Sequence, residues 1–319
     1  KHLPGDVPGW KDHKSRKEKI LSVLEDITDQ DRIFIDENLG TLLDHANISA
    51  EPMVEEGLQF TRRKKDDHTI YFMANHSESR VDGWVELASP CRSALILDPM
   101  SGRTGKARVR GKQDSRNIYL QMDPGETRIL RVFEQEEIVT ADWPVLRSSG
   151  EPVELKGSWN VEFLEGGPFL PEKYRTEKLE SWTNFDLPDA RSFAGAARYT
   201  IDVTLEEPVM DHFFLDLGDV RESARVWVNG HPAGVLVAHP FKLDISGLLE
   251  AGLNQISIEV TNLSANRIRD LDIRGVEWKK FYDINIVSHL YEPFDASTWP
   301  LKPAGLLGPV KLFRAELKK

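Results

Sequence analysis

Residues 213–230 read FFLDLGDVRESARVWVNG. Val226 and Val228 are two positions apart, so their side chains face the same side of a strand. The pair Asn229-Gly230 follows directly, and both of its residues tolerate the positive φ of a tight two-residue turn. We therefore predict a β-hairpin here, and Pro232 places its second strand at the edge of a sheet.

The same short β-rich runs, separated by turn residues, continue on both sides of this hairpin. Their spacing is typical of an antiparallel all-β domain, which we place at residues 150–319. The expected strands are Val153–Leu164, Ala197–Leu205, Asp211–Leu217, Ala224–Val228, Ala233–Val237, Gln255–Val260 and Val310–Leu317.

A second set of short β-rich runs lies earlier, in residues 58–136. The expected strands are Leu58–Arg62, Thr69–Ala74, Gly83–Leu87, Ser93–Leu97, Ala107–Gly111, Asn117–Met122 and Thr127–Glu134. Turn chemistry such as Asp123-Pro124-Gly125 separates them. Seven strands at this spacing predict a compact antiparallel β-sandwich. Residues 137–149 are interpreted as a linker, with Trp143 as its candidate anchor.

Residues 1–57 differ from the rest of the chain. The sequence predicts an amphipathic helix over Ser15–Asp26, a short strand over Asp31–Asp36 and a second helix over Leu39–His45. This segment has too little apolar surface to fold alone, and we interpret it as the remnant or tail of an upstream α/β domain. The predicted fold class is mainly β: two consecutive antiparallel β-sandwiches preceded by a short α/β segment.

The long segment at residues 262–305 combines aromatic rings with charged side chains. Flat rings stack on the apolar faces of sugars, while Asp, Asn and Arg side chains bond the hydroxyls. Loops carried on a rigid sandwich are also common sites of function. The candidates for sugar binding or for lining a cleft are Asn266, Arg267, Asp270, Asp272, Trp278, Tyr282 and Trp299.

A purely structural interpretation of the same residues stays open. The aromatic side chains can fold back on the sheet and form a satellite core. Equally, Arg267 and Arg269 can pair internally with Asp270 and Asp272, which would leave no charged group for a ligand.

The charge balance and composition exclude several partners. Forty-one basic residues against 52 acidic ones give a net charge of −11, which repels nucleic acid and anionic lipid. No apolar run reaches the length of a membrane span. The single Cys91 excludes an internal disulfide and is interpreted as a small buried hydrophobe.

No catalytic residue can be assigned from the sequence. The G-x-S-x-G and H-E-x-x-H motifs and a Cys/His metal spacing are all missing. A glycosidase needs only two carboxylates, but among 52 acidic residues the spacing identifies no pair. The strand–helix alternation of a (β/α)₈ barrel, over ~200 residues or more, is also missing.

Two groups of motifs carry a resemblance to known families. The segment 213–229, followed by Gly230, His239-Pro240-Phe241, Asp244-Ile245 and Gly252-Leu253-Asn254, resembles the galactose-binding-like jelly-roll domain of glycoside hydrolase family 2. Further motifs resemble the C-terminal region of the α-L-rhamnosidases of glycoside hydrolase family 106. They are Tyr71-Phe72-Met73-Ala74-Asn75, Leu97–Gly102, Thr261-Asn262-Leu263, Asn266-Arg267-Ile268 and Gly305–Val310, with Ala304 where a serine is usual.

This resemblance implies a non-catalytic role for the chain itself. The catalytic carboxylates of that family lie on a barrel N-terminal to the matched segments, so none transfers to this sequence. The implied partners are a missing N-terminal catalytic domain and a plant pectic or other rhamnose-containing glycan. The resemblance also implies a bacterial protein exported to the periplasm or the extracellular space, and it allows a structural Ca²⁺ ion whose ligands the sequence does not locate.

Three functional hypotheses therefore remain. The first is an accessory region that supports or completes the substrate cleft of a glycosidase. The second is a stand-alone carbohydrate-binding or surface glycan-adhesion protein. The third is an autonomous glycosidase with carboxylates on the sandwich loops, although the sequence indicates no particular pair of acidic residues for this role.

Overall fold

The computed structural model describes residues 4–28, 34, 36–46, 48, 50–110, 116–205, 212–278 and 294–318. Antiparallel sheets dominate it, so the predicted mainly β fold class is confirmed. None of the helices in the described part of the chain has the length and apolar character to span a bilayer.

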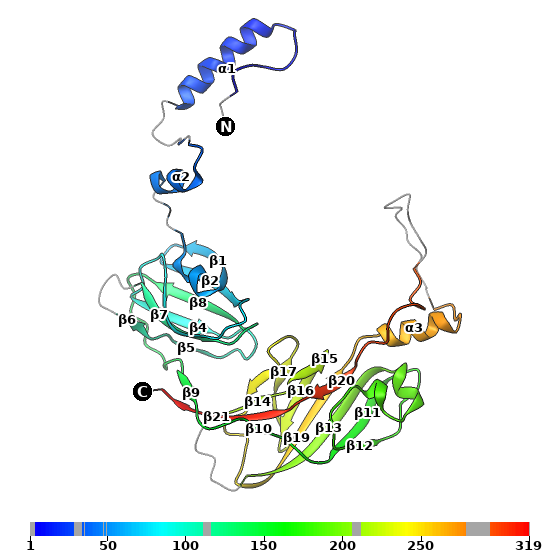
Figure 1. Cartoon of the computed structure of the whole chain (residues 1–319). Helices are drawn as coiled ribbons and strands as arrows, with labels where there is room; N and C mark the ends of the chain where they lie inside the picture. The colour runs from blue at the N-terminus through cyan, green and yellow to red at the C-terminus, as the bar shows by residue number, and fades with distance from the viewer. Residues whose placement is uncertain are drawn as a thin grey trace.

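The N-terminal segment carries the two expected helices. They are α1 (His13–Thr28) and α2 (Leu39–His45). Both extend away from the sandwiches in Figure 1, and α2 buries no residue. Leu21 and Leu39 are 42% and 68% exposed, so apolar side chains of both helices face solvent. The expected strand at 31–36 falls largely outside the described residues.

The first sandwich packs two sheets face to face. The larger sheet has the order β1-β2-β8-β4-β5 and the smaller one the order β3-β7-β6. The strands are β1 (Leu58–Lys65), β2 (His68–Asn75), β3 (Val81–Glu86), β4 (Ser93–Leu97), β5 (Thr104–Lys106), β6 (Val109–Arg110), β7 (Asn117–Met122) and β8 (Thr127–Phe133). A short 3₁₀ helix, η1 (Pro52–Glu56), precedes β1 and buries Met53 completely.

Alternation along these strands builds the core of the first sandwich. Tyr71 and Met73 on β2 are fully buried, as is Leu130 on the neighbouring β8. Cys91 lies in the same core at 1% exposure, and this burial raises the pKa of its thiol to about 12. A thiol with so high a pKa stays protonated, as expected for a small buried hydrophobe.

The second β region contains a six-stranded sheet and a smaller sheet that pack around one core. The six-stranded sheet has the order β12-β11-β13-β19-β16-β17, and the smaller one the order β10-β21-β14-β18, with β9 also paired to β21. Its strands are β9 (Leu146–Ser148), β10 (Val153–Glu154), β11 (Trp159–Gly167), β12 (Tyr174–Thr176), β13 (Ala194–Leu205), β14 (His212–Asp216), β16 (Ser223–Val228), β17 (His231–Leu236), β18 (Lys242–Asp244), β19 (Gly252–Thr261) and β21 (Lys311–Leu317).

Short elements complete this second sandwich. A two-stranded ribbon pairs β15 (Asp219–Arg221) with β20 (Gly305–Gly308). The helical elements are η2 (Trp182–Asn184), η3 (Pro188–Arg191) and α3 (Ala265–Ile273).

The predicted hairpin at 226–232 is confirmed. Asn229 and Gly230 have φ values of 51° and 78°, as a tight turn of this type requires. Val226 and Val228 are 1% and 0% exposed, and they face the same core. Pro232 lies in β17, which is the last strand of its sheet.

Two expectations about strands need correction. The run 153–164 is not one strand, because β10 and β11 belong to different sheets and the chain turns between them at Gly157, whose φ is 143°. Residues 146–148, expected within a linker, form β9 and extend the smaller sheet through β21. The short strands β12, β15 and β18 were not expected, because runs of three residues carry too little periodicity to detect.

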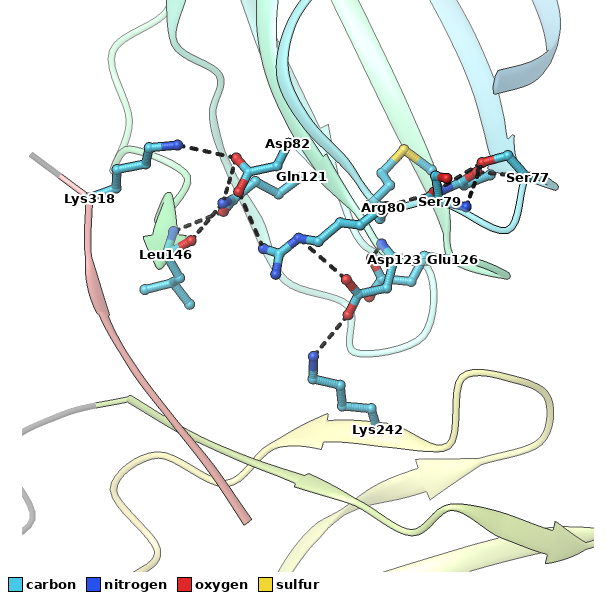
Figure 2. A network of polar contacts seen from close by, with 12 residues as sticks. Ser77, Ser79, Arg80, Asp82, Gln121, Asp123, Glu126, Leu146, Lys242 and Lys318 are labelled. Atoms are coloured by element: carbon cyan, nitrogen blue, oxygen red, sulfur yellow. Dashed lines mark hydrogen bonds and ion pairs between the residues drawn. The ribbon is translucent and has the colours of Figure 1, made fainter. Parts of the chain in front are cut away.

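The two sandwiches meet through a polar network, drawn in Figure 2. We call it the junction network, and it comprises Arg80, Asp82, Gln121, Asp123, Lys242 and Lys318. Lys242 from the second sandwich donates to Asp123 Oδ2 of the first at 2.8 Å. Arg80 lies 3.4 Å from the other oxygen of Asp123 and 3.9 Å from Asp82. The side-chain amide of Gln121 bonds both backbone groups of Leu146, at 2.6 and 2.8 Å.

Asp82 is the acidic centre of the junction network. Burial works against its ionisation, but hydrogen bonds from Tyr119 and Gln121 favour the charged form. Arg80 and Lys318 act in the same direction, and the pKa of Asp82 is lowered overall. A lowered folded pKa means that this contribution to stability is present above the ordinary aspartate pKa. It is lost as the pH falls through the folded value.

Lys242→Met tests the junction network. The ammonium group of Lys242 also lies 5.5 and 5.1 Å from the ring centres of Phe214 and Phe313, so its loss removes an ion pair and two cation–π contacts. Methionine keeps the apolar packing of the stem. We expect the free energy of unfolding to fall by about 1–2 kcal/mol, measured by urea denaturation.

Lys173→Met is the matched control for Lys242→Met. Lys173 pairs with Glu162 at 2.8 Å, but its side chain is 78% exposed. An exposed pair of this kind contributes about 0–1 kcal/mol. Equal effects of the two substitutions would show that the junction network adds nothing beyond an ordinary surface ion pair.

Candidate functional site

The predicted sugar-facing segment is anchored to the second sandwich at its base. We call residues 262–278 and 294–304 the α3 cap. Asn262 accepts a hydrogen bond from the Gly195 N–H at 2.9 Å and donates to the Phe193 carbonyl at 3.0 Å. Both bonds attach the start of the cap to the start of β13, so the base of the cap moves with the six-stranded sheet.

The beginning of the cap is a helix, α3, where an irregular loop was expected. Its C-terminus shows why the chain turns there. The Val276 N–H donates to the Leu271 carbonyl at 2.9 Å, and the Gly275 N–H donates to the Asp272 carbonyl at 3.1 Å. Gly275 has a φ of 62°, which completes a Schellman motif.

Asn266 closes the cap from inside. It is 3% exposed; its side-chain N–H donates to the Lys302 carbonyl and its side-chain oxygen accepts from the Lys302 N–H, both at 2.8 Å. The amide therefore pairs with one backbone residue as a neighbouring strand would. These bonds to the chain occupy both ends of the amide group, so Asn266 is a brace in this structure.

Asp272 and Asp270 also bind within the cap. Asp272 accepts from the Trp278 indole N–H at 2.6 Å and from the Ala296 N–H at 2.8 Å. Asp270 pairs with Arg274, one turn further along α3, at 2.8 Å. The specific pairing that the structural interpretation expected, of Arg267 and Arg269 with Asp270 and Asp272, is therefore not formed among the described residues. Both carboxylates bind other groups of the cap.

Arg269 has a structural partner as well. Its Nε donates to the Trp299 carbonyl at 2.6 Å, which joins α3 to the returning chain. Together with Asn266 and Asp272, this bond fixes three points of the return path from 296 to 302.

The aromatic rings of the cap contact one another edge to face. Phe294 lies between Trp278 and Trp299, with ring centres 6.1 and 5.4 Å apart and interplanar angles of 83° and 85°. Trp278 and Trp299 are half-buried, and Phe294 is 44% exposed. Tyr282 lies outside the described residues. The described rings thus form a satellite cluster with partly exposed faces.

Arg267 differs from the other candidates. Among the described residues, its side chain makes no hydrogen bond, ion pair or ring contact, and its buried Nη1 atom has no acceptor. The guanidinium group lies directly on Gly167, where a Cβ atom would be only 2.9 Å from Nη1. A glycine at position 167 therefore allows Arg267 to reach the tip of β11.

Metal binding receives no support from the described side chains. No group of three or more His, Cys, Asp or Glu residues in the described ranges is arranged to hold a metal ion. A structural Ca²⁺ ion stays a prediction from the resemblance.

The sequence prediction did not include Asn262, Arg274 and Phe294 among its candidate site residues, although all three lie within the segment 262–305 that it singled out. Gly275, together with Ile268 and Leu271 at helical spacing, was the available signal for α3. Such a helix brings residues 270 and 274 together as an i, i+4 pair, which sequence reasoning could have found.

Comparisons with known proteins relate this architecture to enzymes that act on glycosides. The rhamnosidase from Novosphingobium sp. PP1Y superposes on 88% of this chain and 26% of its own, with 21% identity and a TM-score of 0.64. A Formosa agariphila protein named "Putative beta-glucuronidase" is 30% identical over 187 residues, which is 52% of this chain and 16% of that protein. The chain is therefore similar to a part of each of these two proteins, in fold to the first and in sequence to the second. No protein-family model matches it.

The chain is much shorter than these two proteins. It spans about a quarter of the rhamnosidase chain and about a sixth of the Formosa agariphila protein. The superposition on the rhamnosidase extends through both sandwiches, because 88% of the chain takes part in it. Its 21% identity supports the shared fold and no more.

Proposed function

We propose that this chain is the accessory, non-catalytic β region of an α-L-rhamnosidase-like glycoside hydrolase of the family 106 type. In that protein it would support the substrate cleft of a catalytic domain outside residues 1–319. The observation that carries the proposal is the superposition on 88% of the chain but only 26% of the rhamnosidase. The substrate class that follows is a rhamnose-containing glycan, such as pectic oligosaccharide, and export to the periplasm or extracellular space goes with it.

The geometry of the α3 cap favours a structural role for its polar residues over a catalytic one. Its amide Asn266 and its carboxylates Asp270 and Asp272 bind inside the cap, so they hold its shape. A catalytic carboxylate needs a free oxygen at the reacting bond, whereas both oxygens of Asp272 accept hydrogen bonds within the cap. Arg267, Trp278, Trp299 and Tyr282 remain the candidates for contact with a partner or a sugar.

An activity assay tests this proposal. An aryl α-L-rhamnoside is incubated with the chain alone and with the longer gene product that contains it, at equal molar concentration. We expect turnover by the longer product and none above background by the chain alone. Turnover by the chain that survives repurification would contradict the proposal and point to carboxylates within the sandwiches.

The same assay distinguishes the proposed rhamnosidase specificity from a second candidate. The 30% identity to the Formosa agariphila protein favours a β-glucuronidase-type parent. An aryl β-glucuronide is therefore assayed beside the rhamnoside, and hydrolysis of the glucuronide alone would assign that specificity. Glycan titration of the isolated chain tests the stand-alone binding hypothesis, for which saturation at micromolar to millimolar sugar is expected.

A further inference from the structure

Three exposed apolar side chains lie near Arg267 or its contact residue Gly167 along the chain, at one end of the second sandwich. We call Phe169, Leu170, Leu263 and Arg267 the α3 shoulder. Phe169, Leu170 and Leu263 are 68%, 53% and 57% exposed. The Arg267 side chain contacts Gly167, which is two residues before Phe169. Leu263 is four residues before Arg267, a separation of about one helical turn. Figure 1 places α3 and the end of β11 together, away from β9 and the first sandwich.

This combination of residues is typical of a protein interface. Single exposed apolar residues are common on any surface, but a contiguous group marks a binding area. Aromatic and arginine side chains are enriched in the energetically important centre of such areas. An unpaired guanidinium group among apolar neighbours also fits a partner that brings a carboxylate, because the two charges then bind by paired hydrogen bonds.

A sugar fits the α3 shoulder less well than a protein does. Recognition of sugar hydroxyls requires several free amide or carboxylate groups beside a flat ring. The neighbouring Asn266 and Asp270 are bonded within the cap, and Leu170 and Leu263 present branched aliphatic surfaces. The nearby polar groups are therefore committed, while the exposed surface is aliphatic and aromatic.

We infer that the α3 shoulder docks on the catalytic domain of the longer glycoside hydrolase, where Arg267 pairs with an Asp or Glu side chain in an apolar surround. The inference rests on the proposed function. The catalytic domain is the expected occupant because the superposition leaves about three quarters of the rhamnosidase outside this chain. In Figure 1, α3 lies at the end of the second sandwich that is far from β9 and the first sandwich.

Hydrogen exchange of the longer gene product tests the docking surface. Amides of residues 166–172 and 263–275 are compared between the longer product and the isolated chain. We expect at least about tenfold slower exchange in the longer product, because docking must first open before these amides exchange. Equal exchange rates in both proteins would overturn the inference.

The Arg267→Glu substitution tests the ion pair, with Arg191→Glu as the control. Arg191 is an exposed arginine at the end of η3 in the same sandwich. Arg267→Glu should make the protected amides of the longer product exchange about tenfold faster, as expected for the loss of a central interface arginine. It should leave the melting temperature of the isolated chain unchanged, whereas Arg191→Glu should change neither quantity.

The remaining outcomes assign the surface elsewhere. Sedimentation of the isolated chain as a dimer that Arg267→Glu dissociates would overturn the inference in favour of a second copy. Glycan binding by the isolated chain that Arg267→Glu abolishes would overturn it in favour of a sugar. Protection in a longer product that hydrolyses no rhamnoside would uphold docking and refute the proposed substrate. Rhamnosidase activity of a longer product whose amides at 166–172 and 263–275 are not protected would uphold the proposed substrate and refute docking.

Discussion

Gly305→Ala is expected to lower the free energy of unfolding by about 3 kcal/mol. Gly305 has a φ of +99°, which L-amino acids with a side chain adopt only under strain. An added Cβ atom would lie 2.4 Å from the Tyr199 hydroxyl and 2.7 Å from Trp182 Cε3. Tyr199 and Trp182 are fully buried, so neither ring can move aside without disturbing the core.

The position of Gly305 makes this effect relevant to the α3 cap. Its neighbour Ala304 donates its N–H to Ser181 Oγ at 2.9 Å and accepts from the Trp182 N–H at 3.0 Å. The end of the cap therefore enters the core at residues 304 and 305. Strain introduced here acts on the second sandwich and on the return path of the cap together.

Gly247→Ala is the matched control for Gly305→Ala, with urea denaturation as the measurement. Gly247 has a similar positive φ of 76°, but an added Cβ atom would meet nothing within 4 Å. Its substitution should cost only the backbone strain, about 1 kcal/mol. If both variants lose the same stability, the collision with Tyr199 and Trp182 has been relieved by movement, and the packing argument at Gly305 is wrong.

The sequence predicted those parts of the fold that depend on short-range patterns, such as turn residues and alternation along a strand. Asn229-Gly230 specified a turn because only a few residues tolerate positive φ at both turn positions. Alternation at Val226 and Val228 identified the buried face of β16 for a similar local reason. By contrast, the bend at Gly157 divides an uninterrupted apolar pattern, and periodicity alone carries no sign of it.

The candidate site was predictable in composition more than in role. The polar residues of 262–305 were predicted either to bind hydroxyls or to have a structural role, and the sequence did not decide between the two. In the structure Asn266 and Asp272 bond to residues 36 and 24 positions away. Lys242 and Asp123 of the junction network are 119 positions apart. Contacts at such separations depend on the tertiary fold, so a single sequence leaves a brace and a ligand contact indistinguishable.

Asn266→Asp is expected to destabilise the cap by about 3 kcal/mol at neutral pH. The introduced carboxylate cannot donate to the Lys302 carbonyl, and it would place a negative charge 2.8 Å from that oxygen in a site that is 3% exposed. Burial and this repulsion raise the folded pKa of an introduced acid above its unfolded value. Protonation at low pH then restores a donor, so the destabilisation shrinks as the pH falls through the folded pKa.

Urea denaturation across pH 4–7, with hydrogen exchange of α3, measures this effect; Asn160→Asp serves as the control. Asn160 is exposed on β11, where an added carboxylate stays solvated and a change within about 0.5 kcal/mol is expected. A loss of protection confined to α3 and residues 296–302 would mean that the cap opens separately from the sheets. A loss throughout the second sandwich would mean that cap and core unfold together. If Asn266→Asp behaves like Asn160→Asp at every pH, the paired bonds to Lys302 do not hold the cap. The interpretation of Asn266 as a ligand-binding residue would then be favoured over its interpretation as a brace.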